Sequence, residues 1–129
     1  MIAVDTSALM AMLLHEPAKT VCKNAIDLAD KLVISAATLA EALVVADRRS
    51  LGDNMRELID AIEFEVMPVD GATAGRIAEI YSRWGKGVHP ASLNIIDCFA
   101  YDVARRNDCP LLYVGNDFTK TDINPAITA

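Results

Sequence analysis

The chain has 129 residues, 53% of them hydrophobic, and a mean hydropathy of +0.26. We expect a single domain over residues 1–129, because a chain of this length can bury roughly two-thirds of its unfolded surface without disulfides. Eighteen acidic against twelve basic residues give a net charge of −6, which argues against a general binder of nucleic-acid backbones. No segment reaches the roughly 20 apolar residues of a membrane span, so we expect a cytoplasmic protein with no membrane contact.

Short apolar runs alternate with longer helical patterns along the chain. The runs predict strands over residues 2–4, 32–34, 66–69 and 111–114. Apolar spacing and capping signals predict helices over about residues 6–14, 17–29, 36–49, 55–62, 71–84 and 92–107. Strands that alternate with helices indicate a parallel sheet covered on both faces. The predicted fold class is therefore α/β, a three-layer α/β/α domain with a central parallel sheet of about four strands, in which Pro68 marks an edge strand or a strand end.

Individual residues set the expected helix boundaries. Pro17 suits the first turn of the second helix, which would place Val21 and Leu28 on its packed face. Gly52 is expected to stop the third helix, and Ser92 is expected to open the last one.

Two carboxylates lie inside apolar helical stretches. Glu41 lies within residues 38–45 and Asp97 within residues 93–100. Acidic side chains are almost never fully buried unless they are paired, and on a helix the reachable neighbours lie three and four positions away. None of those neighbours is a cation for either residue. A divalent metal is one source of the missing positive charge.

Two further acids follow apolar runs. Asp5 comes directly after residues 2–4, and Asp117 follows residues 111–114 by way of Gly115 and Asn116. In open α/β sheets, ligands bind just outside the carboxyl ends of the strands, so all four acids can meet at one point. Taken alone, Asp5 is explained about equally well as a helix cap and Asp117 as an ordinary turn residue.

A set of carboxylates without His or Cys favours a hard cation such as Mg²⁺ or Mn²⁺. Four like charges repel one another, and a bound cation reverses the resulting tendency to protonate. Such a cation can lower the pKa of bound water and hold a phosphate oxygen, which are the needs of phosphodiester hydrolysis. The chain has no Ser-His-Asp order, P-loop or GxGxxG motif, so we do not expect catalysis by a side-chain nucleophile.

Four segments together resemble a PIN domain of the VapC toxin type. They are residues 1–9 (MIAVDTSAL), 34–42 (ISAATLAEA), 93–101 (LNIIDCFAY) and 115–122 (GNDFTKTD). The resemblance spans nearly the whole chain and implies a metal-dependent endoribonuclease that uses Mg²⁺ or Mn²⁺ and is the toxin of a type II toxin–antitoxin pair. It further implies a homodimer, a cognate antitoxin as partner, and an RNA substrate that is single-stranded or forms a loop of a transfer or ribosomal RNA.

The resemblance also implies roles for individual residues. The acids of the family match Asp5, Glu41, Asp97 and Asp117. Asp5 and Asp97 would be the main metal ligands, while Glu41 would bind directly or through water. Asp117 would be a ligand or the base that orients water. The residues expected to support these acids are Thr6, Ser7, Asn94 and Asn116.

Two positions depart from the family pattern. Ile96 stands where the family often has glycine before the third acid, which affects helix packing at the site. Asn116 stands where the family often has a second Asp, so we expect position 116 to make a secondary contact.

Other classes of protein compete with this interpretation. Haloacid-dehalogenase sites also begin with an acid after the first strand, but they need a second Asp two residues later, where this chain has Ser7. A receiver domain needs an acidic pair near its start and a lysine after a late strand, and this chain shows neither. The alternative from a different class is a catalytically inert PIN-like interaction module that binds an antitoxin. Metal titration separates the nuclease from the inert module, because a catalytic cluster gains thermal stability from Mg²⁺ or Mn²⁺ and an inert module does not.

Overall fold

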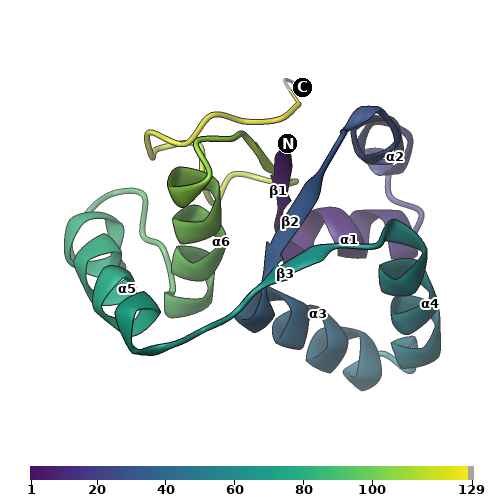
Figure 1. Ribbon diagram of the computed structural model, residues 1–129, viewed down its shortest axis with the longest axis horizontal. Helices are drawn as coiled ribbons and strands as arrows, with labels where there is room; N and C mark the ends of the chain where they lie inside the picture. The colour runs from purple at the N-terminus through teal and green to yellow at the C-terminus, as the bar shows by residue number, and fades with distance from the viewer. Residues whose placement is uncertain (128–129) are drawn as a thin grey trace.

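The computed structural model describes residues 1–127, which form a parallel sheet flanked by helices (Figure 1). The strands are β1 (Ile2–Val4), β2 (Leu32–Ser35), β3 (Glu65–Met67) and β4 (Leu111–Leu112). The helices are α1 (Thr6–Leu13), α2 (Lys19–Leu28), α3 (Ala36–Arg48), α4 (Gly52–Ile62), α5 (Gly71–Trp84) and α6 (Ile95–Arg106).

The sheet has four strands in the order β3-β2-β1-β4, and all neighbouring pairs are parallel. β1 lies between β2 and β4, with Ala3 opposite Val33 on one side and Leu111 on the other. β3 is an edge strand that ends just before Pro68, which confirms the expected place of this proline. Because every strand runs the same way, the residues that follow β1, β2 and β4 emerge at one edge of the sheet.

Successive strand residues pack on opposite faces of the sheet and create two cores. Ala3 and Val33 belong to a buried cluster with residues of α5 and α6, whereas Val4 and Ile34 belong to a second cluster with residues of α1, α2 and α4. Figure 1 shows α5 and α6 on one side of the sheet and α1, α2 and α4 on the other. The predicted three-layer α/β/α architecture is confirmed.

The prediction that Gly52 stops the third helix is wrong. The chain turns after α3 at Ser50, which has a left-handed φ of 58°, and Gly52 is the first residue of α4. Gly52 is buried, and a Cβ at this position would collide with the carboxylate of Asp47, which pairs with Arg56. The glycine is therefore needed for a close approach and not for a helix end.

The packed face of α2 also differs from the prediction. The helix begins at Lys19, two residues after Pro17. Val21 and Leu28 are 48% and 88% exposed, while Cys22 is fully buried. The face that packs is thus rotated by about one residue from the expected one, and it lies against α1, with Cys22 in the same buried cluster as residues of that helix.

The last long helix begins later than predicted. Ser92 has a left-handed φ of 53° and lies before the helix, and Asn94 caps α6 in its place. Within residues 1–127, no helix is both long enough and apolar enough to cross a bilayer.

Candidate active site

Asp5 lies at the carboxyl end of β1 and is the N-cap of α1. Its side chain is 6% exposed and accepts hydrogen bonds from the backbone nitrogen of Ser7 at 3.1 Å and from the Ser7 hydroxyl at 2.6 Å. Burial raises the pKa of Asp5, the two bonds from Ser7 oppose that rise, and the charge of Glu41 adds to it. Asp5 is both the helix cap and a carboxylate short of positive charge.

Ser7 connects the end of β1 with the end of β4. Its Oγ donates to Asp5 and at the same time accepts a hydrogen bond from the backbone nitrogen of Val114 at 3.0 Å. Val114 follows β4 and leads into the segment that carries Asp117. The predicted supporting residue therefore fixes the position of one acid and the path of the chain toward another.

Glu41 is half-buried on α3, which begins directly after β2. α3 is joined to α1 by a hydrogen bond from the hydroxyl of Thr6 to the backbone oxygen of Thr38, 3.3 Å long. The Thr6 side chain was expected to support an acid, but it supports α3 instead. Its hydroxyl ties the helix of Glu41 to the helix capped by Asp5, and only its backbone N–H acts on Asp5 itself.

Asp97 is half-buried in the first turn of α6. Its backbone nitrogen donates to Asn94 Oδ1 at 2.8 Å, and its Oδ2 accepts from the backbone nitrogen of Asn94 at 3.1 Å, which forms a capping box. Burial and, to a smaller extent, the charges of Asp5, Asp117 and Glu41 raise the pKa of Asp97 to about 6, while the hydrogen bond from Asn94 opposes that rise. The fold therefore brings Asp5, Glu41 and Asp117 within electrostatic reach of Asp97.

The segment from Gly115 to Asp122 carries the last predicted residues. Asp117 and Asn116 are exposed, and the backbone oxygen of Asn116 accepts from both the backbone nitrogen and the hydroxyl of Thr119. Phe118 is 1% exposed and anchors the segment in the core. Asn94 likewise has a structural use, because its side-chain oxygen is occupied as the cap of α6.

The donor set fits a hard divalent cation. None of the ion pairs formed within residues 1–127 involves Asp5, Glu41, Asp97 or Asp117. Among the same residues, no three His, Cys, Asp or Glu side chains are already arranged as a metal site. Asp5 and Asp97 are instead turned toward Ser7 and Asn94, as expected of carboxylates that repel one another. A cation would supply the charge that keeps four acids ionised at one place.

The sequence indicates no role for Tyr101, which lies beside this cluster, and describes Asp122 equally well as an aid to the metal site or as a cap of the tail. Tyr101 is one turn after Asp97 on α6, and its hydroxyl donates to Asp122 Oδ1 at 2.6 Å. The only signal in the sequence was the four-residue spacing from Asp97, which equally describes an ordinary core tyrosine.

Comparison with known proteins agrees with this architecture. The PIN domain family matches residues 2–124. The chain is 36% identical to Ribonuclease VapC42 of Mycobacterium tuberculosis, over 97% of this chain and 98% of that protein. It is 39% identical to Ribonuclease VapC36 of the same organism, over 93% and 89%, and 35% identical to a VapC ribonuclease of Rhizobium meliloti, over 93% and 97%. The protein belongs to the PIN-domain family, in its VapC ribonuclease branch.

Two solved structures share the fold. The crystal structure of VapC20 of Mycobacterium tuberculosis, described as a toxin that cleaves the sarcin–ricin loop, superposes with a TM-score of 0.76 at 18% identity, over 95% of this chain and 96% of that one. A toxin–antitoxin complex from Klebsiella pneumoniae gives a TM-score of 0.71 at 17% identity, over 95% and 93%.

Proposed function

We propose that this protein is an endoribonuclease that depends on Mg²⁺ or Mn²⁺ and acts as the toxin of a type II toxin–antitoxin pair in the cytoplasm. The observation that carries the proposal is the environment of Asp97, which is half-buried beside three other carboxylates and has no cation partner among residues 1–127. A structural carboxylate in such a place would be expected to pair with a basic side chain. A site that gathers unpaired acids is suited to a metal-assisted hydrolysis.

Each acid has a distinct place in the proposed mechanism. A bound divalent ion supplies a water of lowered pKa and a positive charge for the phosphate oxygens. Asp5 and Asp97 would hold the ion, and Glu41 would bind it directly or through water. Asp117, the most exposed of the four, accepts the proton of the attacking water. Ser7 and Asn94 fix the orientations of Asp5 and Asp97 through the hydrogen bonds that they make in the folded chain.

The proposed substrate is RNA that is single-stranded or forms an exposed loop. A phosphodiester can approach Asp117 only where the strand is free to enter an acidic, partly buried site, and bases splayed out of a helix meet that need. The fold relationship to VapC20, described as cleaving the sarcin–ricin loop, supports a loop of a ribosomal or transfer RNA.

The proposed protein partners are a cognate antitoxin and a second copy of this chain. The fold relationship to a chain from a toxin–antitoxin complex supports the antitoxin. An acidic, unpaired cluster is also a surface that a basic side chain of an inhibitor can neutralise.

Incubation of the purified protein with total RNA tests the proposal. We expect new RNA ends in the presence of Mg²⁺ or Mn²⁺ and none when a chelator is added. Asp97→Asn should lower the cleavage rate by at least about 100-fold, because it removes a proposed ligand but keeps an oxygen that can accept the Asn94 hydrogen bond.

Asp108→Asn is the matched control. It makes the same chemical change just beyond the other end of α6, at an exposed residue with a left-handed φ of 47° that Asn accommodates well. Cleavage that survives the chelator, or an Asp97→Asn protein as active as Asp108→Asn, would contradict the proposal. A wild-type protein that binds the ion but never cuts would favour the inert interaction module.

A further inference from the structure

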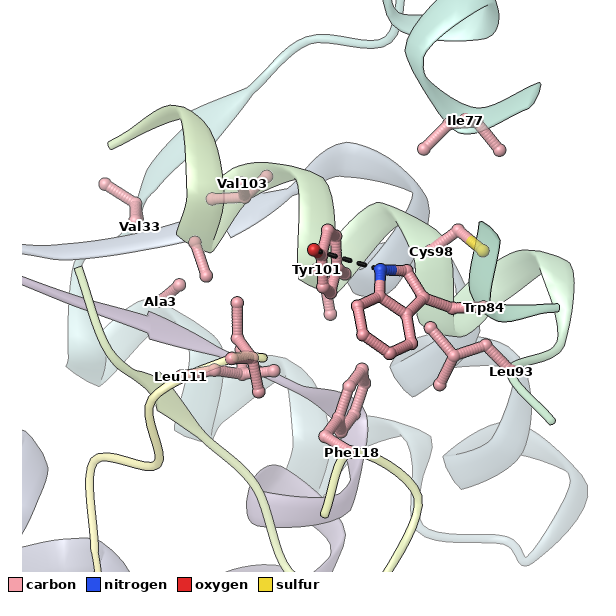
Figure 2. Packing of buried hydrophobic residues seen from close by; sticks show 13 residues of the cluster. Ala3, Val33, Ile77, Trp84, Leu93, Cys98, Tyr101, Val103, Leu111 and Phe118 are labelled. Atoms are coloured by element: carbon pink, nitrogen blue, oxygen red, sulfur yellow. Dashed lines mark hydrogen bonds between the residues drawn. The ribbon is translucent and has the colours of Figure 1, made fainter. Parts of the chain in front are cut away.

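A chain of hydrogen bonds crosses from α5 through α6 to the segment that carries Asp117. Trp84, the last residue of α5, donates from Nε1 to the hydroxyl of Tyr101 at 3.1 Å, as Figure 2 shows. The same hydroxyl donates to Asp122 Oδ1 at 2.6 Å, and Asp122 Oδ2 lies 3.9 Å from Arg83. Tyr101 is 5% exposed and the Asp122 side chain is 36% exposed, so this bond to a carboxylate is partly buried.

Tyr101 and Asp97 lie one helical turn apart on the same face of α6. The segment that meets them contains Asp117 and, five residues later, Asp122. Asp117 contributes a repulsive charge at Asp97, whereas Asp122 accepts a hydrogen bond from Tyr101. The first turn of α6 therefore meets the segment in the repulsive pair Asp97 and Asp117. The next turn meets it in the hydrogen-bonded pair Tyr101 and Asp122.

The other contacts of the segment are the packing of Phe118 in the core, including against Tyr113, and hydrogen bonds between near neighbours in the chain. Phe118 is buried and lies in the same cluster as Trp84 and Tyr101 (Figure 2). The hydroxyls of Thr119 and Thr121 donate to backbone oxygens within the segment, at 2.9 and 2.7 Å, and Thr121 Oγ1 also accepts from the backbone nitrogen of Ile123 at 3.2 Å. The Phe118 side chain fixes the depth of the segment, but a nonpolar contact does not fix its direction. A short, charge-assisted hydrogen bond does, and such bonds are about twice as strong as neutral ones.

We propose that Tyr101 and Asp122 are positioning residues that hold Asp117 beside Asp97 against the repulsion between the two acids. The inference rests on the proposed function, since it assigns to this hydrogen bond the completion of the metal-binding and proton-accepting set. Neither residue touches the reacting atoms. Both act through the path of residues 115–122.

The test compares three variants with the wild-type protein. Tyr101→Phe keeps the ring in the core and removes the hydroxyl, Asp122→Ala removes the acceptor, and Asp122→Asn keeps an oxygen that can accept the bond. Tyr81→Phe is the matched control, because the Tyr81 hydroxyl makes a single long bond, 3.4 Å to the backbone oxygen of Lys86, away from the segment. The readouts are the RNA cleavage rate at saturating Mn²⁺, the Mn²⁺ affinity measured by calorimetry without RNA, and the melting temperature.

We expect Tyr101→Phe and Asp122→Ala each to lower the cleavage rate about tenfold and to weaken Mn²⁺ binding severalfold. The cleavage rate and Mn²⁺ affinity of Asp122→Asn should lie between those of these two variants and the wild type. Both quantities should be unchanged in Tyr81→Phe. In an Asp117→Asn background, Tyr101→Phe should cause no further loss, because the hydroxyl acts through Asp117. A purely structural role would instead lower the rate by the same factor in both backgrounds.

The inference is overturned if folded Tyr101→Phe and Asp122→Ala proteins bind Mn²⁺ and cleave RNA as the wild type does. It is also overturned if the loss caused by Tyr101→Phe is equally large in the Asp117→Asn background. A wild-type protein without metal-dependent cleavage would overturn the proposed function alone, since the Mn²⁺ affinities of the same variants still decide whether the hydrogen bond positions Asp117. Should Tyr101→Phe fail to fold, the comparison of Asp122→Ala with Asp122→Asn gives the same decision.

Discussion

The hydroxyl of Ser7 lies 2.6 Å from Asp5 Oδ2 and holds the most buried acid of the candidate site. Ser7 Oγ also accepts a hydrogen bond from the backbone nitrogen of Val114, a residue 107 positions away in the sequence. One small side chain therefore orients a carboxylate at the end of β1 and attaches the chain that leaves β4.

Replacement of Ser7 by Ala should weaken metal binding and cleavage by about tenfold, the lower end of the range for groups that orient metal ligands. The variant loses the bond that fixes Asp5 and leaves the Val114 N–H without its acceptor, which costs about 1 kcal/mol of folding stability. Mn²⁺ calorimetry and urea unfolding measure the two effects. Ser7→Thr keeps the hydroxyl and is the control. Equal Mn²⁺ affinity in Ser7→Ala and wild type would show that Asp5 needs no such support.

The pH dependence of the metal-free protein should show the raised pKa of Asp97. Its folded pKa is about 6 and its unfolded value is 3.8, so the folded state binds more protons than the unfolded state between these values. Stability must therefore fall as the pH rises from about 4 to about 6. The loss from this group is about 1 kcal/mol, allowing for the solvent screening of a half-buried carboxylate.

The Asp97→Asn variant isolates this effect, because it cannot ionise at position 97. The free energy of unfolding of the wild type minus that of the variant, measured in a chelator between pH 4 and pH 8, should decrease through the same window. The pKa of Asp5 is also raised, so part of the fall in stability with rising pH should remain in the Asp97→Asn variant. A difference that stays flat with pH would mean that Asp97 is not held among unpaired acids.

Addition of metal should restore the folding stability that the protein loses above pH 6 when Asp97 ionises. A cation that binds only the folded state stabilises it by about 2.7 kcal/mol at 100 times its dissociation constant. We expect Mn²⁺ to raise the melting temperature of the wild type at pH 7.5 and a chelator to return it to the starting value. Asp97→Asn should show a much smaller rise, whereas Asp108→Asn should match the wild type. Equal shifts in the two variants would place the ion elsewhere.

Two of the four acids stand out in the sequence because each one breaks a local expectation: Glu41 and Asp97 are charges inside apolar helical stretches. Asp5 and Asp117 break no such expectation and stand out only by their places after apolar runs and by the family resemblance. Such violations are visible in a short window of sequence. The order of strands and helices was equally local, and for this reason the three-layer fold was predicted correctly.

The contacts that arrange the acids were not predictable in this way. Ser7 meets Val114 and Tyr101 meets Asp122 only after the chain has folded, and neither pair has a spacing that marks it. Gly52 failed as a helix stop for a related reason. Its role depends on the nearby Asp47 carboxylate, while the left-handed turn is made by Ser50, a residue type that rarely signals one.

Thr38 offers a test of the packing beneath the acids. Its side chain is fully buried on α3 and its hydroxyl has no hydrogen-bond partner among residues 1–127. A buried polar group without a partner costs about 1 to 3 kcal/mol, so the isosteric change Thr38→Val should stabilise the protein by about 1 kcal/mol. In a chain of this length that corresponds to a rise in melting temperature of about 4 °C.

Thr73→Val is the opposite control for Thr38→Val. Thr73 is also buried, but its hydroxyl completes the capping box of α5 with Asp70 and accepts from Arg76 at 3.2 Å. The same chemical change there should destabilise the protein by about 1 kcal/mol. Urea unfolding of both variants measures the difference. If both changes destabilise, the Thr38 hydroxyl has a partner, such as a buried water on α3.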